Sequence, residues 1–293
     1  MNFSEIAASM GGRDNFQLGI LAKPDVPAQT GVVVLVGGPQ YRAGSHRQFV
    51  LLSRALAQEG FAVLRIDYRG MGDSDGMPYK FTNVSPDIAR AIDAFQTQVP
   101  TLRHIVLWGL CDGASAALLY LHDTRDARVT GLCLLNPWVR SEASLARTQV
   151  KHYYTQRLKQ REFWVKLASG KVAASAVAGL IKSVRSMRGS RKPQAASNLL
   201  FQDKMRLAWR DFRGSLLLIL SGDDYTAKEF LEYAQADPQW LSALQQPNVC
   251  RHEVNDADHT FSDPKHSRDV EMTTIRWLKN ELDDPSHTMR FEP

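Results

Sequence analysis

The stretch LWGLCDGASA, residues 107–116, places a cysteine between two glycines, directly after an apolar run and directly before an alanine-rich one. Gly109, Cys111 and Gly113 form the pattern G-x-C-x-G, the cysteine version of the sharp strand-to-helix turn that exposes a catalytic nucleophile. Glycine is needed on both sides because a side chain there would collide with neighbouring backbone. HIVLWG before the turn predicts a strand, and DGASAALLYLHD after it predicts a helix. We therefore interpret Cys111 as a nucleophile; the alternative is a small buried core cysteine.

Short β-branched or leucine-rich runs alternate with helical patterns along most of the chain. GVVVLVGG, residues 31–38, predicts a buried strand, and the helical spacing that follows ends at Gly60. Further strands are predicted at 61–67, 104–109, 129–136, 215–222 and 249–254, and helices at 85–99, 112–123 and 270–282. Upstream, NFQLGILAKP, residues 15–24, predicts an antiparallel edge strand. This alternation indicates an α/β fold with a mostly parallel central sheet and helices on both faces.

The alternation fails between residues 137 and 213, where the sequence is helical in character. This segment holds 17 Lys and Arg against four acidic residues, whereas the whole chain has a formal net charge of only +5. We predict a basic helical cap insertion at 139–213, between a first core part at 1–138 and a second at 214–293. The basic segment 171–192 would suit an anionic membrane surface, and the alternative is a packed cap helix with solvated charges.

Two further motifs make the chain resemble the α/β-hydrolase superfamily over nearly its whole length. IDYRGMGDSDG, residues 66–76, is similar to the D-x-R-G-x-G-x-S loop that follows the fourth strand in many members. VGGP, residues 36–39, resembles the HGGP oxyanion loop, with valine in place of histidine. The resemblance implies an α/β-hydrolase fold with a cap. We expect Asp67, Arg69 and Ser74 to hold their loop beside the site rather than to touch substrate.

A narrower resemblance rests on three motifs. GLCDGASAALLY, GGPQYRAGSHRQF and LSGDDYTAKEF are similar to the exosortase A system-associated hydrolases, type 1, which accompany bacterial exopolysaccharide and protein-sorting genes. This resemblance implies a biological setting more than a reaction. It does not specify whether the substrate is a small molecule or a lipid-linked acyl compound.

The order of a catalytic triad in this fold is nucleophile, acid, histidine. Asp223 and Asp224 follow the strand that ends at Gly222, where a loop normally delivers the acid, and we favour Asp224 over Asp223. His259 lies in the polar loop after the last strand, in ADHTF, which is similar to the G-H-x-F of the family. The sequence thus predicts the triad Cys111, Asp224 and His259. The alternative is that both aspartates only cap a helix or a turn.

Attack on a carbonyl creates an oxyanion, which needs fixed hydrogen-bond donors. The N–H of Asp112, directly after the nucleophile, is one expected donor, and the glycine loop supplies the other. Pro39 has no N–H, so this second donor is Gly38 or Gln40, and the resemblance to HGGP favours Gly38. The carboxylate of Asp112 would oppose thiolate formation, so we expect it to point away or to cap the following helix. The helix N-terminus and His259 should favour the thiolate.

Other features restrict the class of protein. Three cysteines stand far apart with no CxxC spacing, which argues against a zinc site or a disulfide framework and suggests a reducing compartment. We expect no signal peptide, no membrane span, no cofactor and no nucleic-acid partner. We therefore expect a cytoplasmic protein, and the basic segment allows peripheral contact with the inner membrane.

Two functional hypotheses follow. The first is a hydrolase or acyltransferase that acts on an ester or thioester through an acyl-Cys111 intermediate. The second is a non-catalytic accessory protein that binds a membrane or a biosynthetic complex through its basic cap. The chain keeps the acid, the histidine and the glycines of the oxyanion loop, and this favours the enzyme.

Overall fold

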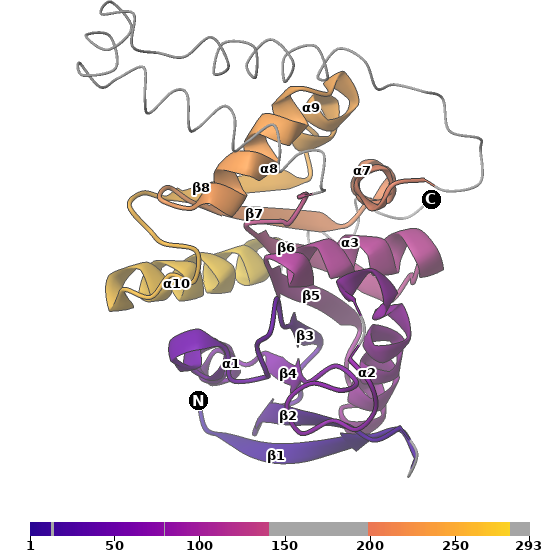
Figure 1. Cartoon of the computed structure of the whole chain (residues 1–293). Coiled ribbons are helices and arrows are strands. Elements are labelled where there is room, and N and C mark those ends of the chain that lie inside the picture. Colours follow the sequence, from indigo (N-terminus) through magenta and orange to yellow (C-terminus); the bar gives the residue numbers. More distant parts are fainter. Residues whose placement is uncertain (13–14, 79, 141–198, 282–293) are drawn as a thin grey trace, which may run out of the picture. The chain divides into compact units, whose positions relative to one another are not determined.

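The computed structural model describes residues 1–12, 15–78, 80–140 and 199–281. Within these ranges, one eight-stranded sheet has the order β1-β2-β4-β3-β5-β6-β7-β8. Its strands are β1 Phe3–Met10, β2 Gln17–Pro24, β3 Thr30–Leu35, β4 Ala62–Ile66, β5 His104–Leu110, β6 Val129–Leu135, β7 Ser215–Ser221 and β8 Val249–Val254. All neighbours from β4 to β8 pair in parallel, whereas β2 is antiparallel to both β1 and β4 (Figure 1). The predicted mostly parallel sheet is confirmed.

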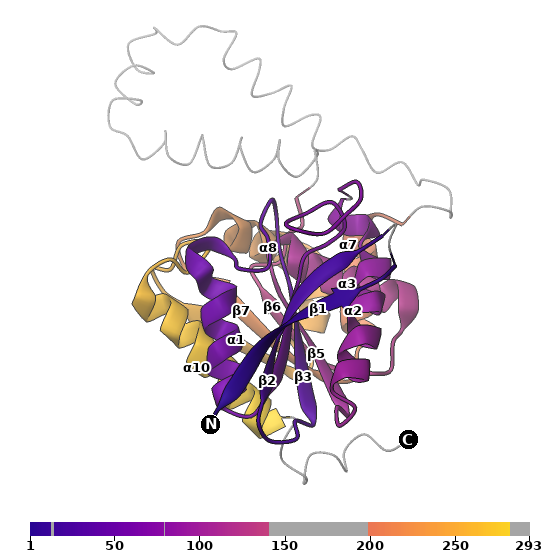
Figure 2. The same ribbon diagram turned by 90° about the horizontal axis from the view of Figure 1, so that it is seen from below.

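Helices cover both faces of this sheet. They are α1 Gln48–Gln58, α2 Ser85–Gln98, α3 Asp112–Thr124, α7 Phe201–Asp211, α8 Tyr225–Gln235, α9 Pro238–Leu244 and α10 Pro264–Glu281, with short 3₁₀ turns at Ser45–Arg47 and Phe81–Asn83. Helices α1 and α10 pack together on one face, and α2 and α3 lie on the other (Figure 2). The sheet is therefore the middle layer of three, as expected for parallel strands that are apolar on both sides.

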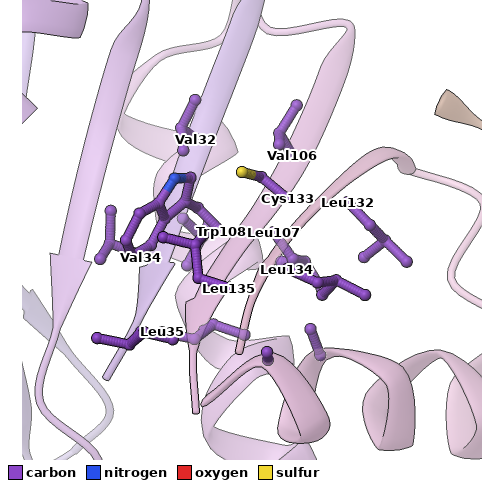
Figure 3. Close-up of a cluster of buried hydrophobic side chains, with 14 of the residues drawn as sticks. Val32, Val34, Leu35, Val106, Leu107, Trp108, Leu132, Cys133, Leu134 and Leu135 are labelled. Atoms are coloured by element: carbon purple, nitrogen blue, oxygen red, sulfur yellow. The ribbon is translucent and has the colours of Figure 1, made fainter. Parts of the chain in front are cut away.

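The centre of the sheet forms the hydrophobic core. Every residue of β3 is buried, and so is every residue of β7. Figure 3 shows side chains of β3, β5 and β6 packed together, among them Trp108 and Cys133. Cys133 is fully buried there, and its burial raises the pKa of its thiol. A thiol in this environment is a small core residue, so Cys133 is no rival to Cys111 as a nucleophile.

The N-terminal strands differ from the sequence prediction in one respect. Residues 15–24 were expected to form an antiparallel edge strand, and β2 is indeed antiparallel. However, β2 is not at the edge, because β1 pairs along its whole length from Phe3–Pro24 to Met10–Gln17. The burial of β1 is irregular, with its first five residues at least partly exposed. A strand with so little buried surface gives a weak hydrophobic pattern in the sequence.

The carboxyl-terminal bound of the predicted cap insertion, residue 213, falls inside the compact core. The described core forms one compact unit made of 1–139 and 200 onward. Helix α7, which falls inside the predicted insertion 139–213, belongs to this unit and packs on α3 and α9. Its Trp209 is fully buried and donates a hydrogen bond from Nε1 to the carbonyl oxygen of Ala243 at 3.1 Å. The second core part therefore starts about one helix earlier than residue 214. Residues 141–198, which include the predicted basic surface 171–192, lie outside the described residues.

Candidate active site

Cys111 occupies the turn between β5 and α3. Its φ of 60° lies in a region that residues other than glycine rarely adopt. A Cβ at Gly109 would lie 2.5 Å from the carbonyl carbon of Gly113, and one at Gly113 would lie 2.5 Å from the carbonyl oxygen of Leu35. Both positions thus exclude a side chain. The predicted strand, sharp turn and helix are present, and the turn places Cys111 at the carboxyl end of the sheet, partly exposed.

Asp224 and His259 meet at the same end of the sheet. Asp224 is the N-cap of α8, where its carboxylate accepts hydrogen bonds from the N–H groups of Thr226 and Ala227 at 3.1 and 3.0 Å. The same carboxylate lies 2.9 Å from Nδ1 of His259. Burial alone would raise the pKa of Asp224, but the hydrogen bond to His259 and those from the helix bring this pKa below its ordinary value. The carboxylate is therefore ionised at neutral pH and fixed in position.

His259 contacts Cys111 as well as Asp224. Hydrogen bonds with the Asp224 carboxylate and with the Cys111 thiol raise the pKa of His259 to about 10, although burial acts in the opposite direction. An imidazole with this pKa is protonated at neutral pH. The three side chains predicted from the sequence thus form one connected group, in the order acid, histidine, cysteine. This is the geometry that proton transfer between a thiol and an oriented imidazole requires.

The raised pKa of His259 predicts how stability changes with pH. Its charged form contributes stability that is complete below the unfolded-state pKa of about 6.5 and is lost as the pH rises through about 10. Urea unfolding of wild type and His259→Gln should therefore show a difference in free energy that shrinks between pH 6 and pH 10. A difference that stays constant over this range would mean that the folded imidazole is not charged.

The glycine loop, residues 36–39, approaches the turn that carries Cys111 closely, but the N–H group of Gly38 already donates a hydrogen bond to a side chain. A Cβ at Gly37 would lie 2.1 Å from the carbonyl oxygen of Leu110, so only glycine permits this approach. The N–H of Gly38 donates to Oδ1 of Asp112 at 2.5 Å. Burial raises the pKa of Asp112, and hydrogen bonds from the N–H groups of Gly38, Asp112 and Gly113 offset part of that rise.

This arrangement corrects one expectation about Asp112. Its carboxylate was expected to point away from the nucleophile or to cap the helix. It does bind N–H groups of the first turn of α3, but it also turns toward the glycine loop and binds Gly38. The physical reason is that unpaired N–H groups converge here from two segments, and a carboxylate satisfies several of them at once.

The two alternates from the sequence lie outside this group. The side chain of Asp223 is 82% exposed and pairs with Lys228 at 3.4 Å, whereas that of Asp224 is 7% exposed. The side chain of Gln40 donates from Nε2 to Oγ of Ser45 at 3.0 Å. Asp224 is therefore the acid that contacts His259, as favoured from the sequence.

The loop after β4 is tied down as expected. Oγ of Ser74 donates to the carbonyl oxygen of Asp67 at 3.0 Å, and Arg69 pairs with Asp87 of α2 at 2.6 Å. The carboxylate of Asp67 accepts from the backbone N–H of Arg42 at 2.7 Å and pairs with the Arg42 guanidinium. Arg42, which the sequence analysis did not single out, thus links the glycine loop to the loop after β4.

Asn136 is a second supporting residue that the sequence analysis missed. It follows β6 with a φ of 44°, and its Nδ2 donates to Oγ of Ser221 at 2.8 Å and to the carbonyl oxygen of His259 at 3.3 Å. Its Oδ1 accepts from the N–H of Ser221 at 2.9 Å. Asn136 therefore fixes the loop that carries His259 to the end of β7. The only signal in the sequence is an asparagine directly after a buried strand.

A large cavity among the described residues lies away from this site. It has a volume of about 880 Å³ and lies at the amino ends of β5, β6 and β7, lined by residues such as His104, Val129 and Ser215. Cys111 follows the opposite end of β5, so this cavity does not contain the triad. No group of three or more His, Cys, Asp or Glu in the described ranges is arranged to hold a metal ion.

The comparisons with known proteins agree with the fold. Residues 32–269 match the model of the alpha/beta hydrolase family, so the chain belongs to this family. The chain is also similar to human Protein ABHD12B, with 49% identity over 47 residues, which are 16% of this chain and 12% of that protein. The chain thus aligns with only a small part of that relative.

Solved structures of low sequence identity share the fold. The Pyrococcus furiosus esterase Pf2001 superposes with a TM-score of 0.63 and 16% identity, covering 96% of this chain and 94% of the esterase. A dienelactone hydrolase from Anabaena variabilis superposes with a TM-score of 0.61 and 15% identity, and the match covers 96% of this chain and 100% of that one. XC6422 from Xanthomonas campestris is described as an α/β serine hydrolase without lid. It superposes with a TM-score of 0.58 and 14% identity, and the match covers 97% of this chain and 98% of that one. Separately, no helix in the described part of the chain is long and apolar enough to cross a membrane.

Proposed function

We propose that this protein is a hydrolase or acyltransferase that uses Cys111 as its nucleophile and acts on an ester or a thioester. The observation that carries the proposal is the connected group of Asp224, His259 and Cys111, in which His259 is held protonated beside the thiol. A protonated imidazole next to a cysteine favours the thiolate, which is the attacking species. The exposed turn at the carboxyl end of the sheet supports the same role.

The reaction would proceed in two steps. The Cys111 thiolate attacks the carbonyl carbon, and the resulting oxyanion is stabilised by the N–H groups of Gly38 and Asp112. Collapse of this intermediate expels the alcohol or thiol, which takes the proton from His259, and leaves an acyl-Cys111 thioester. His259, now neutral, removes a proton from water or another acceptor, which attacks the thioester and regenerates the thiolate. Asp224 keeps Nδ1 of His259 protonated throughout, so that Nε2 faces the reacting groups.

The natural acyl group is proposed from the resemblance alone. The three motifs similar to exosortase-associated hydrolases favour an acyl compound of a bacterial exopolysaccharide or protein-sorting system, whether a small molecule or a lipid-linked precursor. The esterase and the dienelactone hydrolase with similar folds support carboxylic ester chemistry in general. Contact of the basic segment with an anionic inner-membrane surface belongs to the same proposal.

Trapping the acyl-enzyme tests the proposed function. Purified protein is mixed with p-nitrophenyl esters and acyl thioesters of several chain lengths, and quenched samples are analysed by intact mass and peptide mapping. We expect a burst of product and one acyl group per chain, located on Cys111. If no ester gives an adduct, and iodoacetamide labels Cys111 no faster than the exposed Cys250, the accessory-protein hypothesis replaces this proposal.

A further inference from the structure

The Asp112 carboxylate occupies the place where the oxyanion of the proposed reaction would bind. Its Oδ1 lies 2.5 Å from the nitrogen of Gly38, and the carboxylate also accepts hydrogen bonds from the N–H groups of Asp112 and Gly113. Gly38 and Asp112 are the two donors expected to stabilise the tetrahedral intermediate. A fixed anion of the protein therefore fills the same donors that a reacting carbonyl needs.

The fit of the carboxylate between the two segments is close. Oδ1 of Asp112 lies only 2.9 Å from the place that a Cβ on Gly37 would take, and Cβ of Cys111 lies 3.2 Å from it. The carboxylate thus lies between the glycine loop and the nucleophile. Asp112 is nevertheless only partly buried, and it does not belong to the hydrophobic core.

We propose that Asp112 is an internal ligand of the oxyanion hole, which must leave the N–H groups of Gly38 and Asp112 before acyl transfer can occur. The inference rests on the proposed function and deepens it. Hydrogen bonds to an ionised acceptor are stronger than those to a neutral one, so the carbonyl of a bound ester does not displace the carboxylate. The oxyanion of the transition state carries the charge needed to compete. Asp112 therefore acts as a positioning residue that controls the hole, and its side chain lowers the basal rate of acylation.

Two rates measured on the same protein distinguish an effect on the oxyanion hole from an effect on the reactivity of the Cys111 thiolate. Acylation by p-nitrophenyl acetate passes through an oxyanion, whereas alkylation by iodoacetamide is a direct displacement at carbon and passes through none. Loss of the Asp112 charge changes the reactivity of the thiolate in both reactions. The ratio of acylation to alkylation therefore reports the oxyanion hole, and a merely structural role of Asp112 would not move it.

The test compares Asp112→Ala, Asp112→Asn and wild type. We expect Asp112→Ala to raise the ratio by about tenfold or more, because it frees the N–H of Gly38 from a charge-assisted hydrogen bond. Asp112→Asn should raise it less, because a neutral amide oxygen still accepts from Gly38. Asp123→Asn is the matched control, since it removes the same charge from the same helix at its far, exposed end, and its ratio should equal that of wild type.

The resonance of the Gly38 amide proton provides a readout that needs no turnover. In labelled protein it should move upfield in Asp112→Ala, because the hydrogen bond to a carboxylate is lost. An unchanged Gly38 resonance, or an unchanged or lower ratio in both Asp112 variants, overturns the inference. If wild type still forms an acyl-Cys111 adduct in that case, the proposed function stands. If no protein is acylated, including Asp112→Ala, both proposals fail.

Discussion

Replacement of Cys111 by alanine is expected to lower kcat/KM for p-nitrophenyl esters by about a thousandfold or more. The remaining oxyanion donors and binding contacts cannot supply an attacking atom, and His259 would have to activate water directly. The adduct seen by intact mass should disappear together with the burst. Initial rates under pseudo-first-order conditions, with folding checked by circular dichroism, measure this loss.

The other cysteines provide the control for this experiment. Cys250 is exposed and Cys133 is fully buried in the core, so Cys250→Ala removes an exposed thiol without creating a cavity. We expect Cys250→Ala to retain wild-type turnover and the full adduct. Turnover that survives in Cys111→Ala at more than a tenth of the wild-type rate would contradict a nucleophilic role for Cys111.

The identity of the site residues could be predicted from the sequence because each belongs to a local pattern. Gly109, Cys111 and Gly113 lie within five consecutive residues, and the close contacts of both glycines explain why no other residue fits there. Asp224 follows the buried strand β7 and His259 follows its parallel neighbour β8, and the carboxyl ends of parallel strands lie at one edge of the sheet. The fold therefore follows from periodicity, whereas the proposed triad also needed the resemblance of its motifs to those of α/β-hydrolases.

The remaining parts of the site depend on contacts between distant loops. Arg42 reaches Asp67 across 25 residues, Asn136 reaches Ser221 across 85, and Asp112 binds Gly38 across 74. Nothing within a few residues of these positions specifies the direction of their side chains. The same reason explains why α7 was not assigned to the core from the sequence. Its Trp209 is buried through contacts with α9, which a local sequence pattern does not reveal.

Replacement of Asp224 by asparagine is expected to lower kcat/KM by about a hundredfold or more. Asparagine keeps the shape of the side chain and is a good N-cap, so α8 should stay intact. It removes the negative charge that raises the pKa of His259 and that fixes the proton on Nδ1. The variant should therefore alkylate Cys111 more slowly with iodoacetamide at neutral pH, because its imidazolium partner is lost.

Asp223→Asn is the matched control, since it makes the same chemical change at the adjacent position. The Asp223 side chain is 82% exposed and pairs with Lys228 rather than with His259. Such a surface pair contributes little to stability, so both turnover and the alkylation profile should remain those of wild type. Equal losses in the two variants would mean that the general charge of this loop matters, rather than a hydrogen bond to His259. A loss confined to Asp224→Asn assigns the acid of the triad to the side chain that the fold buries beside the histidine.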